Sequence, residues 1–266
     1  MNPDTFRMRP SRVLRKLRAG ELASCFKLNL LDGRVAELAA MHGFDSLWLC
    51  MEHVPNDWSE IEKQILAARI YDVDTLVRIA RGSYSDYIRP LEMNATGIIV
   101  PHIMSLEDAR HVVHMTRFHP VGRRPVDGGN ADGAYCNIAF TDYIAQANRE
   151  RMVFLQIEDP EPLSELDEIA ALPGYDALLF GPGDFSHAIG VPSQVNHPEV
   201  EDARRRVAAA ARKHGKFAAT VGGLADLPRL FEMGYQWVCS GADVLGLNEY
   251  CKQMVAGFAQ AVPREK

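Results

Sequence analysis

The sequence predicts an α/β protein whose residues 1–266 form a single domain, a (β/α)8 TIM barrel. Three observations lead to this prediction. Short apolar, β-rich runs alternate eight times with helical segments, the 266 residues match the roughly 250 that such a barrel needs, and no linker or low-complexity tract divides the chain. Eight parallel strands close at a diameter that side chains can fill, which favours a closed barrel over an open sheet.

The predicted elements follow the chain in regular alternation. A helix at about 6–19, with Val13, Leu14 and Leu17 at helical spacing, is expected to cover one end of the barrel. The first four strands are predicted at 22–29, 46–52, 74–80 and 97–103, and helices between and after them include 34–42, 59–71 and about 85–94. The last four strands are predicted at 153–158, 177–181, 217–221 and 237–240, each followed by a helical stretch.

Two further segments carry expectations of their own. A stretch rich in Gly, Pro, Asp and Asn at 118–137 is too long and polar for a plain connector, so we expect an active-site loop. The helix at about 243–262 has an apolar stripe that suits a contact between subunits. Its members are Leu245, Leu247, Tyr250, Met254 and Phe258.

Composition and charge exclude several classes of function. A net charge of −6 and a pI near 5.9 provide no basic surface for nucleic acid. No apolar run approaches the roughly 18 residues that span a bilayer, so no membrane partner is expected. The five cysteines are scattered without a C-x-x-C pair, which is typical of reduced thiols in a cytoplasmic protein.

Carboxylates stand directly after two of the predicted strands. Glu158 ends the run Val153–Ile157, and Asp184 follows Leu178-Leu-Phe-Gly-Pro-Gly. Because a buried unpaired charge is costly and the ends of neighbouring parallel strands converge, two such acids suit a divalent cation such as Mg²⁺. An ion pair, or a helix N-cap in the case of Asp184, is the alternative.

Other polar residues stand at the same predicted strand ends. Arg78 interrupts an apolar strand and could hold a ketone or carboxylate oxygen, or simply pair with a carboxylate. His53 follows a strand in a loop with turn residues and is a candidate base, while His102 could face the substrate or be structural. Lys27 is the one lysine placed for Schiff-base chemistry, which is the less favoured mechanism.

Three blocks of the sequence resemble the HpcH/HpaI aldolase family. They are FDSLWLCMEHVPND at 44–57, LQIE at 155–158 and FGPGDFS at 180–186. The resemblance extends over nearly the whole chain and implies a metal-dependent, class II aldolase that cleaves a 4-hydroxy-2-oxo acid to pyruvate and an aldehyde. It also implies a homo-oligomer, as a hexamer built from a trimer of dimers.

The same resemblance implies roles for individual residues. Glu158 and Asp184 would hold the metal, Mg²⁺ or Mn²⁺ with Co²⁺ as a further option, and Gln156 would lie beside it. Arg78 would stabilise the enolate oxygen, and His53 would serve as base and acid at the 4-hydroxyl. The backbone of the turn before the next helix would hold the pyruvate carboxylate, through Gly181, Pro182, Gly183 and Asp184.

This chain departs from the family pattern at two places. Cys50 stands where members usually have the aspartate near the histidine, so another acid is expected to support His53. Glu52 and Glu92 are the candidates, and Glu92 is favoured because it falls where the family usually places another acid. The second departure is Gly122-Arg-Arg-Pro125 in place of the usual Gly-x-Arg-Gly, which affects the expected aldehyde half of the substrate. Two alternatives stay open: a barrel lyase that acts on another oxo acid or acyl thioester, and a catalytically impaired barrel that binds an oxo acid.

Overall fold

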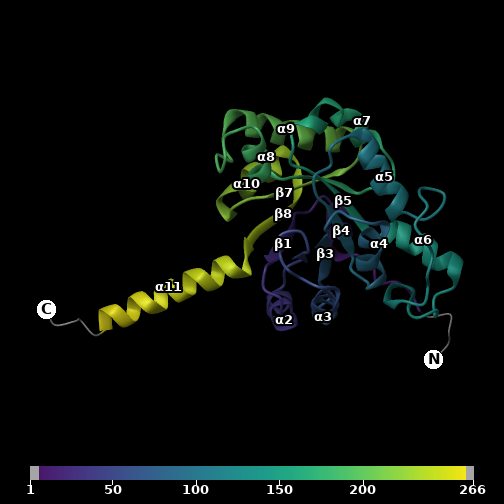
Figure 1. The fold of residues 1–266 in the computed structure, drawn as a ribbon, viewed down its shortest axis with the longest axis horizontal. Helices are drawn as coiled ribbons and strands as arrows, with labels where there is room; N and C mark the ends of the chain where they lie inside the picture. Colours follow the sequence, from purple (N-terminus) through teal and green to yellow (C-terminus); the bar gives the residue numbers. More distant parts are fainter. Residues whose placement is uncertain (1–5, 262–266) are drawn as a thin grey trace.

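A closed barrel of eight parallel strands forms the centre of the computed structural model, which describes residues 6–261 (Figure 1). Neighbouring strands pair in chain order, and β8 closes the sheet against β1. This confirms the predicted (β/α)8 fold. The strands are β1 Ala23–Leu28, β2 Ser46–Cys50, β3 Asp74–Arg78, β4 Gly97–Val100, β5 Met152–Ile157, β6 Ala177–Phe180, β7 Phe217–Val221 and β8 Tyr235–Ala242.

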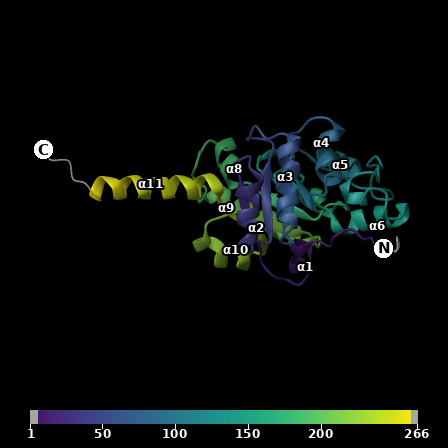
Figure 2. The same ribbon diagram turned by 90° about the horizontal axis from the view of Figure 1, so that it is seen from below.

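Helices surround the barrel, and short 3-10 turns lie in three of the connections (Figures 1 and 2). The helices are α1 Arg12–Arg18, α2 Gly33–Met41, α3 Trp58–Arg69, α4 Tyr84–Glu92, α5 Leu106–Thr116, α6 Phe140–Glu150, α7 Leu166–Ala171, α8 Pro182–Ala188, α9 Pro198–Lys213, α10 Leu227–Met233 and α11 Asp243–Ala261. The 3-10 turns are η2 Ala131–Gly133, η3 Glu161–Ser164 and η4 Leu224–Asp226.

Aromatic side chains fill the interior of the barrel. Trp237 contacts Trp48 and Phe154, with ring centroids 6.1 and 5.4 Å away, and its indole N–H donates to Ser46 Oγ at 3.0 Å. Strand residues alternate between this interior and the layer beneath the helices, so both sides of the sheet are apolar. With the interior packed, the chemistry is confined to the open end of the barrel.

The other end of the barrel is covered by α1. Val13, Leu14 and Leu17 pack with the interior residues, and Asp74, at the start of β3, accepts hydrogen bonds from Ser11 Oγ at 2.6 Å and the Val13 N–H at 2.8 Å. The helix is shorter than the predicted 6–19, because Pro10 disfavours helical backbone in the residue before it and Ser11 caps the helix by accepting from the Leu14 N–H.

The polar stretch at 118–137 does not lie at the active end of the barrel, so the prediction of an active-site loop is wrong. It follows helix α5 and therefore starts where the chain has returned to the N-terminal ends of the strands. Buried Arg124 pairs with Asp132 at 3.0 Å, and Asn94, which precedes β4, donates to the Ala131 carbonyl. The polar residues of the 118–137 stretch therefore form a buried ion pair and do not take part in the catalytic end of the barrel.

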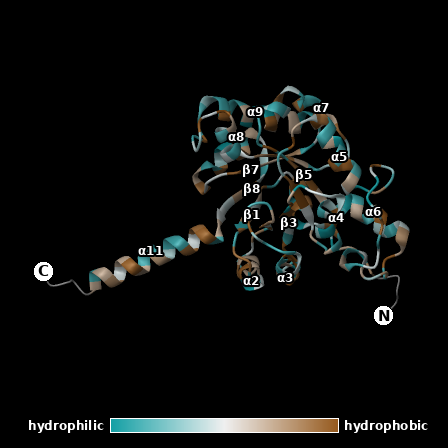
Figure 3. Ribbon diagram, in the orientation of Figure 1, coloured by the Kyte–Doolittle hydropathy of each residue, from teal (hydrophilic) through white to brown (hydrophobic). Residues whose placement is uncertain are grey.

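Helix α11 projects away from the barrel (Figures 1 and 2). Only Asp243 at its start is buried, and apolar residues such as Val255 and Phe258 are 70% and 74% exposed. In Figure 3 hydrophobic stretches alternate with hydrophilic ones along the projecting helix. Within residues 6–261, none of the helices combines the length and the apolar character that crossing a membrane requires.

Candidate active site

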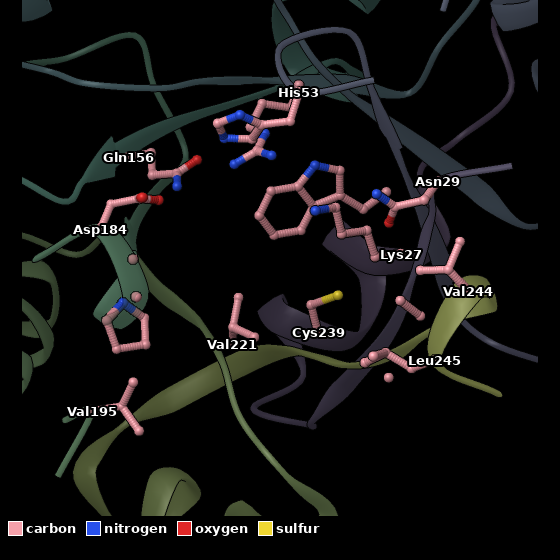
Figure 4. Close-up of a pocket in the computed structure, with 17 residues that line it drawn as sticks. Lys27, Asn29, His53, Gln156, Asp184, Val195, Val221, Cys239, Val244 and Leu245 are labelled. Atoms are coloured by element: carbon pink, nitrogen blue, oxygen red, sulfur yellow. The ribbon is translucent and has the colours of Figure 1, made fainter. Parts of the chain in front are cut away.

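A cavity of about 530 Å³ opens at the C-terminal ends of the strands (Figure 4). Residues from β1, β2, β3, β5, β6, β7 and β8, or from the loops directly after them, line it. Most of the residues predicted for the site share this cavity, namely His53, Arg78, Gln156, Gly181, Pro182, Gly183 and Asp184.

Glu158 follows β5 directly and is fully buried. One carboxylate oxygen accepts the backbone N–H of His102 at 3.0 Å, and the other contacts the side-chain amide of Gln156. Burial raises the pKa of Glu158 to about 7; the His102 N–H and ring counteract this, and the charges of Asp184 and Glu52 add to it. Among residues 6–261, no lysine or arginine forms an ion pair with this carboxylate. Within the described residues, Glu158 therefore lacks a permanently charged partner.

His102 and Glu52 complete a compact set of possible metal ligands with Glu158. One donor atom from each of the three residues lies within 4.8 Å of the others. His102 adopts a left-handed backbone with φ of 49°, and its Nδ1 lies 2.8 Å from Asp159 Oδ2, which directs Nε2 toward Glu52 and Glu158. The pKa of His102 is raised: burial opposes protonation, but the bond to Asp159 and the surrounding carboxylates outweigh it.

The sequence had left the role of His102 open and had not singled out Asp159. A signal was present, because Asp159 directly follows Glu158 and two consecutive acids at a strand end are unusual. His102 adopts a left-handed backbone that directs its N–H toward Glu158. No feature of the sequence indicates this conformation.

Asp184 lies in the first turn of α8, on the same side of the cavity as Gln156 (Figure 4). It is near enough for its charge to raise the pKa of Glu158, although it is not part of the three-residue ligand group. Gln156 is buried, and its Oε1 has no hydrogen-bond partner among the described residues. An oxygen without a donor beside two carboxylates suits a cation or a substrate hydroxyl.

Arg78, the last residue of β3, is buried and is held on three sides. Its Nη2 donates to Cys50 Sγ at 3.2 Å, and its guanidinium lies 4.8 Å from the centre of the Trp48 ring. Its Nε is 2.9 Å from Glu52 Oε2, yet the N–H does not point at that oxygen, so the contact is an ion pair rather than a hydrogen bond. Cys50, at the position where the resemblance implies an aspartate, thus helps to orient the arginine.

His53 lies at the rim of the cavity and is half exposed. Its Nε2 is 3.5 Å from Glu52 Oε2, and its backbone N–H donates to Cys50 Sγ at 3.5 Å. Within the chain, Glu52 is therefore the carboxylate beside this histidine, and the prediction that Glu92 takes this place is wrong. Glu92 ends α4 near Arg124 and Asp132, where burial raises its pKa. That position is at the N-terminal end of the barrel.

The geometry gathers the groups that an enolate-forming reaction needs. Arg78, His53 and Asp184 line one cavity, and two members of the possible ligand group contact its lining: Glu52 contacts Arg78, and Glu158 contacts Gln156. Positive charge beside a 2-oxo group stabilises the oxyanion that forms when an adjacent C–C or C–H bond breaks, and a histidine can exchange the proton. In the Gly181–Gly183 turn at the mouth, the Gly181 N–H donates to Ile157 and Pro182 has no N–H, so Gly183 is the residue of the turn that can offer a backbone donor to a small acid.

Comparison with known proteins places the chain among aldolases. Residues 25–248 match the sequence profile described as HpcH/HpaI aldolase/citrate lyase. The hydroxypyruvate/pyruvate aldolase of Pseudomonas aeruginosa is 32% identical over 254 residues, covering 95% of this chain and 94% of the relative. A 2-keto-3-deoxy-L-rhamnonate aldolase of Klebsiella pneumoniae subsp. pneumoniae is 31% identical over 258 residues, with 95% of each chain covered. The crystal structure of an HpcH/HpaI aldolase/citrate lyase family protein from Burkholderia cenocepacia J2315 superposes with a TM-score of 0.85 at 30% identity, covering 93% of this chain and 99% of the other.

Gly181 offers a direct test of how tightly the site is built. A Cβ at this position would lie 2.7 Å from Glu158 Oε2 and 2.8 Å from Glu158 Cβ. We expect Gly181→Ala to lower the free energy of unfolding by about 1–3 kcal/mol, because the buried carboxylate has no room to move. Urea denaturation measures the change.

Gly183→Ala is the matched control in the same turn, because a Cβ there meets nothing within 4 Å. It should leave the free energy of unfolding unchanged or raise it slightly, as alanine favours helix. Equal stability of the two variants would contradict the close packing of Gly181 against Glu158.

Proposed function

The chain belongs to the HpcH/HpaI aldolase/citrate lyase family, and from this premise we propose that it cleaves a 4-hydroxy-2-oxo acid to pyruvate and an aldehyde with the help of a divalent cation. The observation that supports this most is Glu158, buried without a lysine or arginine partner among the described residues and in contact with Gln156 of a cavity that Arg78 and His53 also line. The aldolase names of the relatives support the same reaction type.

The acids of the site fit a resident divalent cation. Burial raises the pKa of Glu158, with the charges of Asp184 and Glu52 adding to it, and Gln156 Oε1 has no donor among the residues described. We assign Glu158 and Asp184 as the ligands, with Gln156 beside them and Glu52 and His102 as the other donors within reach. Oxygen ligands suit Mg²⁺ or Mn²⁺, and Co²⁺ also accepts such a set. When bound, the cation supplies a Lewis acid at the 2-oxo oxygen.

The residues of the chain would divide the remaining work. Arg78, already held by Cys50 and Glu52, directs its guanidinium at the oxygen that becomes the enolate. His53 takes the proton from the 4-hydroxyl, the C3–C4 bond breaks, and its electron pair enters the pyruvate enolate, which then takes a proton at C3. Glu52 beside His53 stabilises the imidazolium formed on the way. The Gly181–Gly183 turn receives the pyruvate carboxylate.

Glu158→Gln tests the assignment. The amide keeps the size of the side chain and removes its charge, so metal content should fall to background and pyruvate release should drop by roughly 10²-fold or more. The measurements are elemental analysis of purified protein and a pyruvate-release assay on a panel of 4-hydroxy-2-oxo acids. Stripping the wild type with a chelator should abolish release, and adding Mn²⁺ should restore it.

Glu107→Gln serves as the matched control, since Glu107 is an exposed carboxylate on α5 outside the cavity. It should bind metal and turn over like the wild type. Full metal content in Glu158→Gln would refute the metal site. Metal binding without pyruvate release from any panel member would instead favour the catalytically impaired, oxo-acid-binding barrel.

We also propose that α11 packs against a second copy of this chain. An apolar hollow of about 500 Å³ lies at the base of α11, lined mainly by Phe26, Val35, Leu38, Phe44 and Leu247. The exposed side of α11 is apolar, as the hollow is. A helix that packs against nothing has little stability in water, so α11 is expected to pack against another surface. The hexamer implied by the resemblance stays a prediction.

Light scattering after gel filtration tests this contact. The wild type should elute as a dimer or a larger assembly, and Phe258→Asp combined with Tyr250→Asp should shift it toward the monomer, because charge is costly in an apolar contact. Gln253→Asp on the same helix is the control and should leave the mass unchanged. A monomeric wild type would disprove the proposal.

A further inference from the structure

The turn after β4 is held by an ion pair that the proposed steps do not use. Arg81 lies in the loop between β3 and α4, and Asp108 lies in the first turn of α5. The Arg81 Nη1 donates to Asp108 Oδ2 at 2.8 Å, and its Nη2 donates to the other oxygen of the same carboxylate. The Nη1 also donates to the backbone carbonyl of His102. One guanidinium thus joins the loop after β3, the turn after β4 and the start of α5.

The backbone of His102 needs such support, because its conformation is unfavourable. Its φ of 49° lies in the left-handed region, which a residue with a Cβ adopts at a steric cost. Among residues 6–261, no backbone N–H donates to the His102 carbonyl, so its donor is Arg81. Asp108 supports the same turn two residues later by accepting the Met104 N–H at 3.1 Å. The Arg81–Asp108 pair therefore holds the backbone from residue 102 to residue 104.

The conformation of this turn determines which groups reach Glu158. The His102 N–H donates to Glu158 Oε1 at 3.0 Å, and the His102 Nε2 lies 3.7 Å from the same oxygen. The next N–H along the chain, that of Ile103, donates to the Gln156 carbonyl at 3.1 Å. Hydrogen bonds of this kind orient a metal ligand, and their loss weakens metal binding even though the ligand itself is unchanged.

We propose that Arg81 is a positioning residue of the metal site, which acts by holding the His102 turn in the left-handed conformation that orients Glu158. This inference rests on the proposed function, because it takes Glu158 as a ligand of the cation. Arg81 itself is not among the residues that line the cavity. An ion pair that only joined a loop to a helix near the surface would contribute little to stability and nothing to metal binding.

Titration of Mn²⁺ into chelator-stripped protein, with the free ion followed by EPR, tests this role without any substrate. Arg81→Met removes the hydrogen-bond donors and keeps a long side chain, so the Kd for Mn²⁺ should rise about 10-fold. Arg81→Lys should give a smaller rise, because an ammonium can reach the carbonyl but cannot replace the two-pronged contact with Asp108.

Arg110→Met is the matched control. Arg110 lies on α5, where it forms an exposed pair with Glu107 at 3.7 Å, and its removal should leave the Kd for Mn²⁺ unchanged. Circular dichroism verifies that each variant is folded.

His102→Gly separates positioning from a general effect on the structure. Glycine adopts the left-handed backbone without the steric cost and keeps the N–H, so the turn should depend less on Arg81. Adding Arg81→Met to His102→Gly should therefore raise the Kd less than about 2-fold relative to His102→Gly alone. Each comparison is made within one background, so the loss of the imidazole does not enter it.

Three outcomes would overturn the inference, and they are distinguishable. An unchanged Kd in Arg81→Met, beside a wild type that binds Mn²⁺, would leave the proposed function standing and remove the role of Arg81. An equal rise from Arg81→Met in both backgrounds would mean that Arg81 does not act through the His102 turn. A wild type that binds no Mn²⁺ would overturn this inference together with the proposed function.

Discussion

A carboxylate buried without a lysine or arginine partner is the constraint on which this site depends. Glu158 is fully buried at the end of β5, and burial raises its pKa to about 7. Its neighbours are arranged around that charge: the His102 backbone donates to one oxygen, Gln156 approaches the other, and Gly181 lacks the Cβ that would collide with it. A fold seldom retains such a penalty at a strand end unless a ligand relieves it.

The cavity has a polar side next to Glu158 and a mostly apolar side opposite it. Acids and Gln156 occupy the side formed by β5 and β6, and Arg78 lies between them and the Trp48 ring. The opposite wall, formed by β8 and β1, is apolar apart from Lys27 and Asn29.

The sequence was sufficient for the fold and for most residues around the cavity, because both follow from local patterns. Alternating apolar runs place the strands, and in a barrel every residue directly after a strand points to the same end. Glu158 was found in this way, and Arg78 and Gln156 near the ends of their strands and Asp184 shortly after β6 follow from the same reasoning. The predicted β4 ran to residue 103, but the strand ends at Val100, since Pro101 cannot donate to the ladder.

Where the prediction failed, contacts distant in sequence decided the outcome. Glu92 was favoured as the partner of His53 by its place in a family pattern, but α4 carries it to the far end of the barrel, whereas the adjacent Glu52 reaches the ring. The stretch at 118–137 is polar because of a buried Arg124–Asp132 pair, and composition cannot separate that from a catalytic loop. Nothing local in the sequence shows that α11 leaves the barrel.

Exchange of the pyruvate methyl protons with D₂O, followed by NMR, tests the central claim most directly, because it requires the oxo-acid half alone and no aldehyde. The exchange should depend on added Mg²⁺ or Mn²⁺ and should be lost in Asp184→Asn. Metal-independent exchange, or exchange at the wild-type rate in Asp184→Asn, would contradict the central claim.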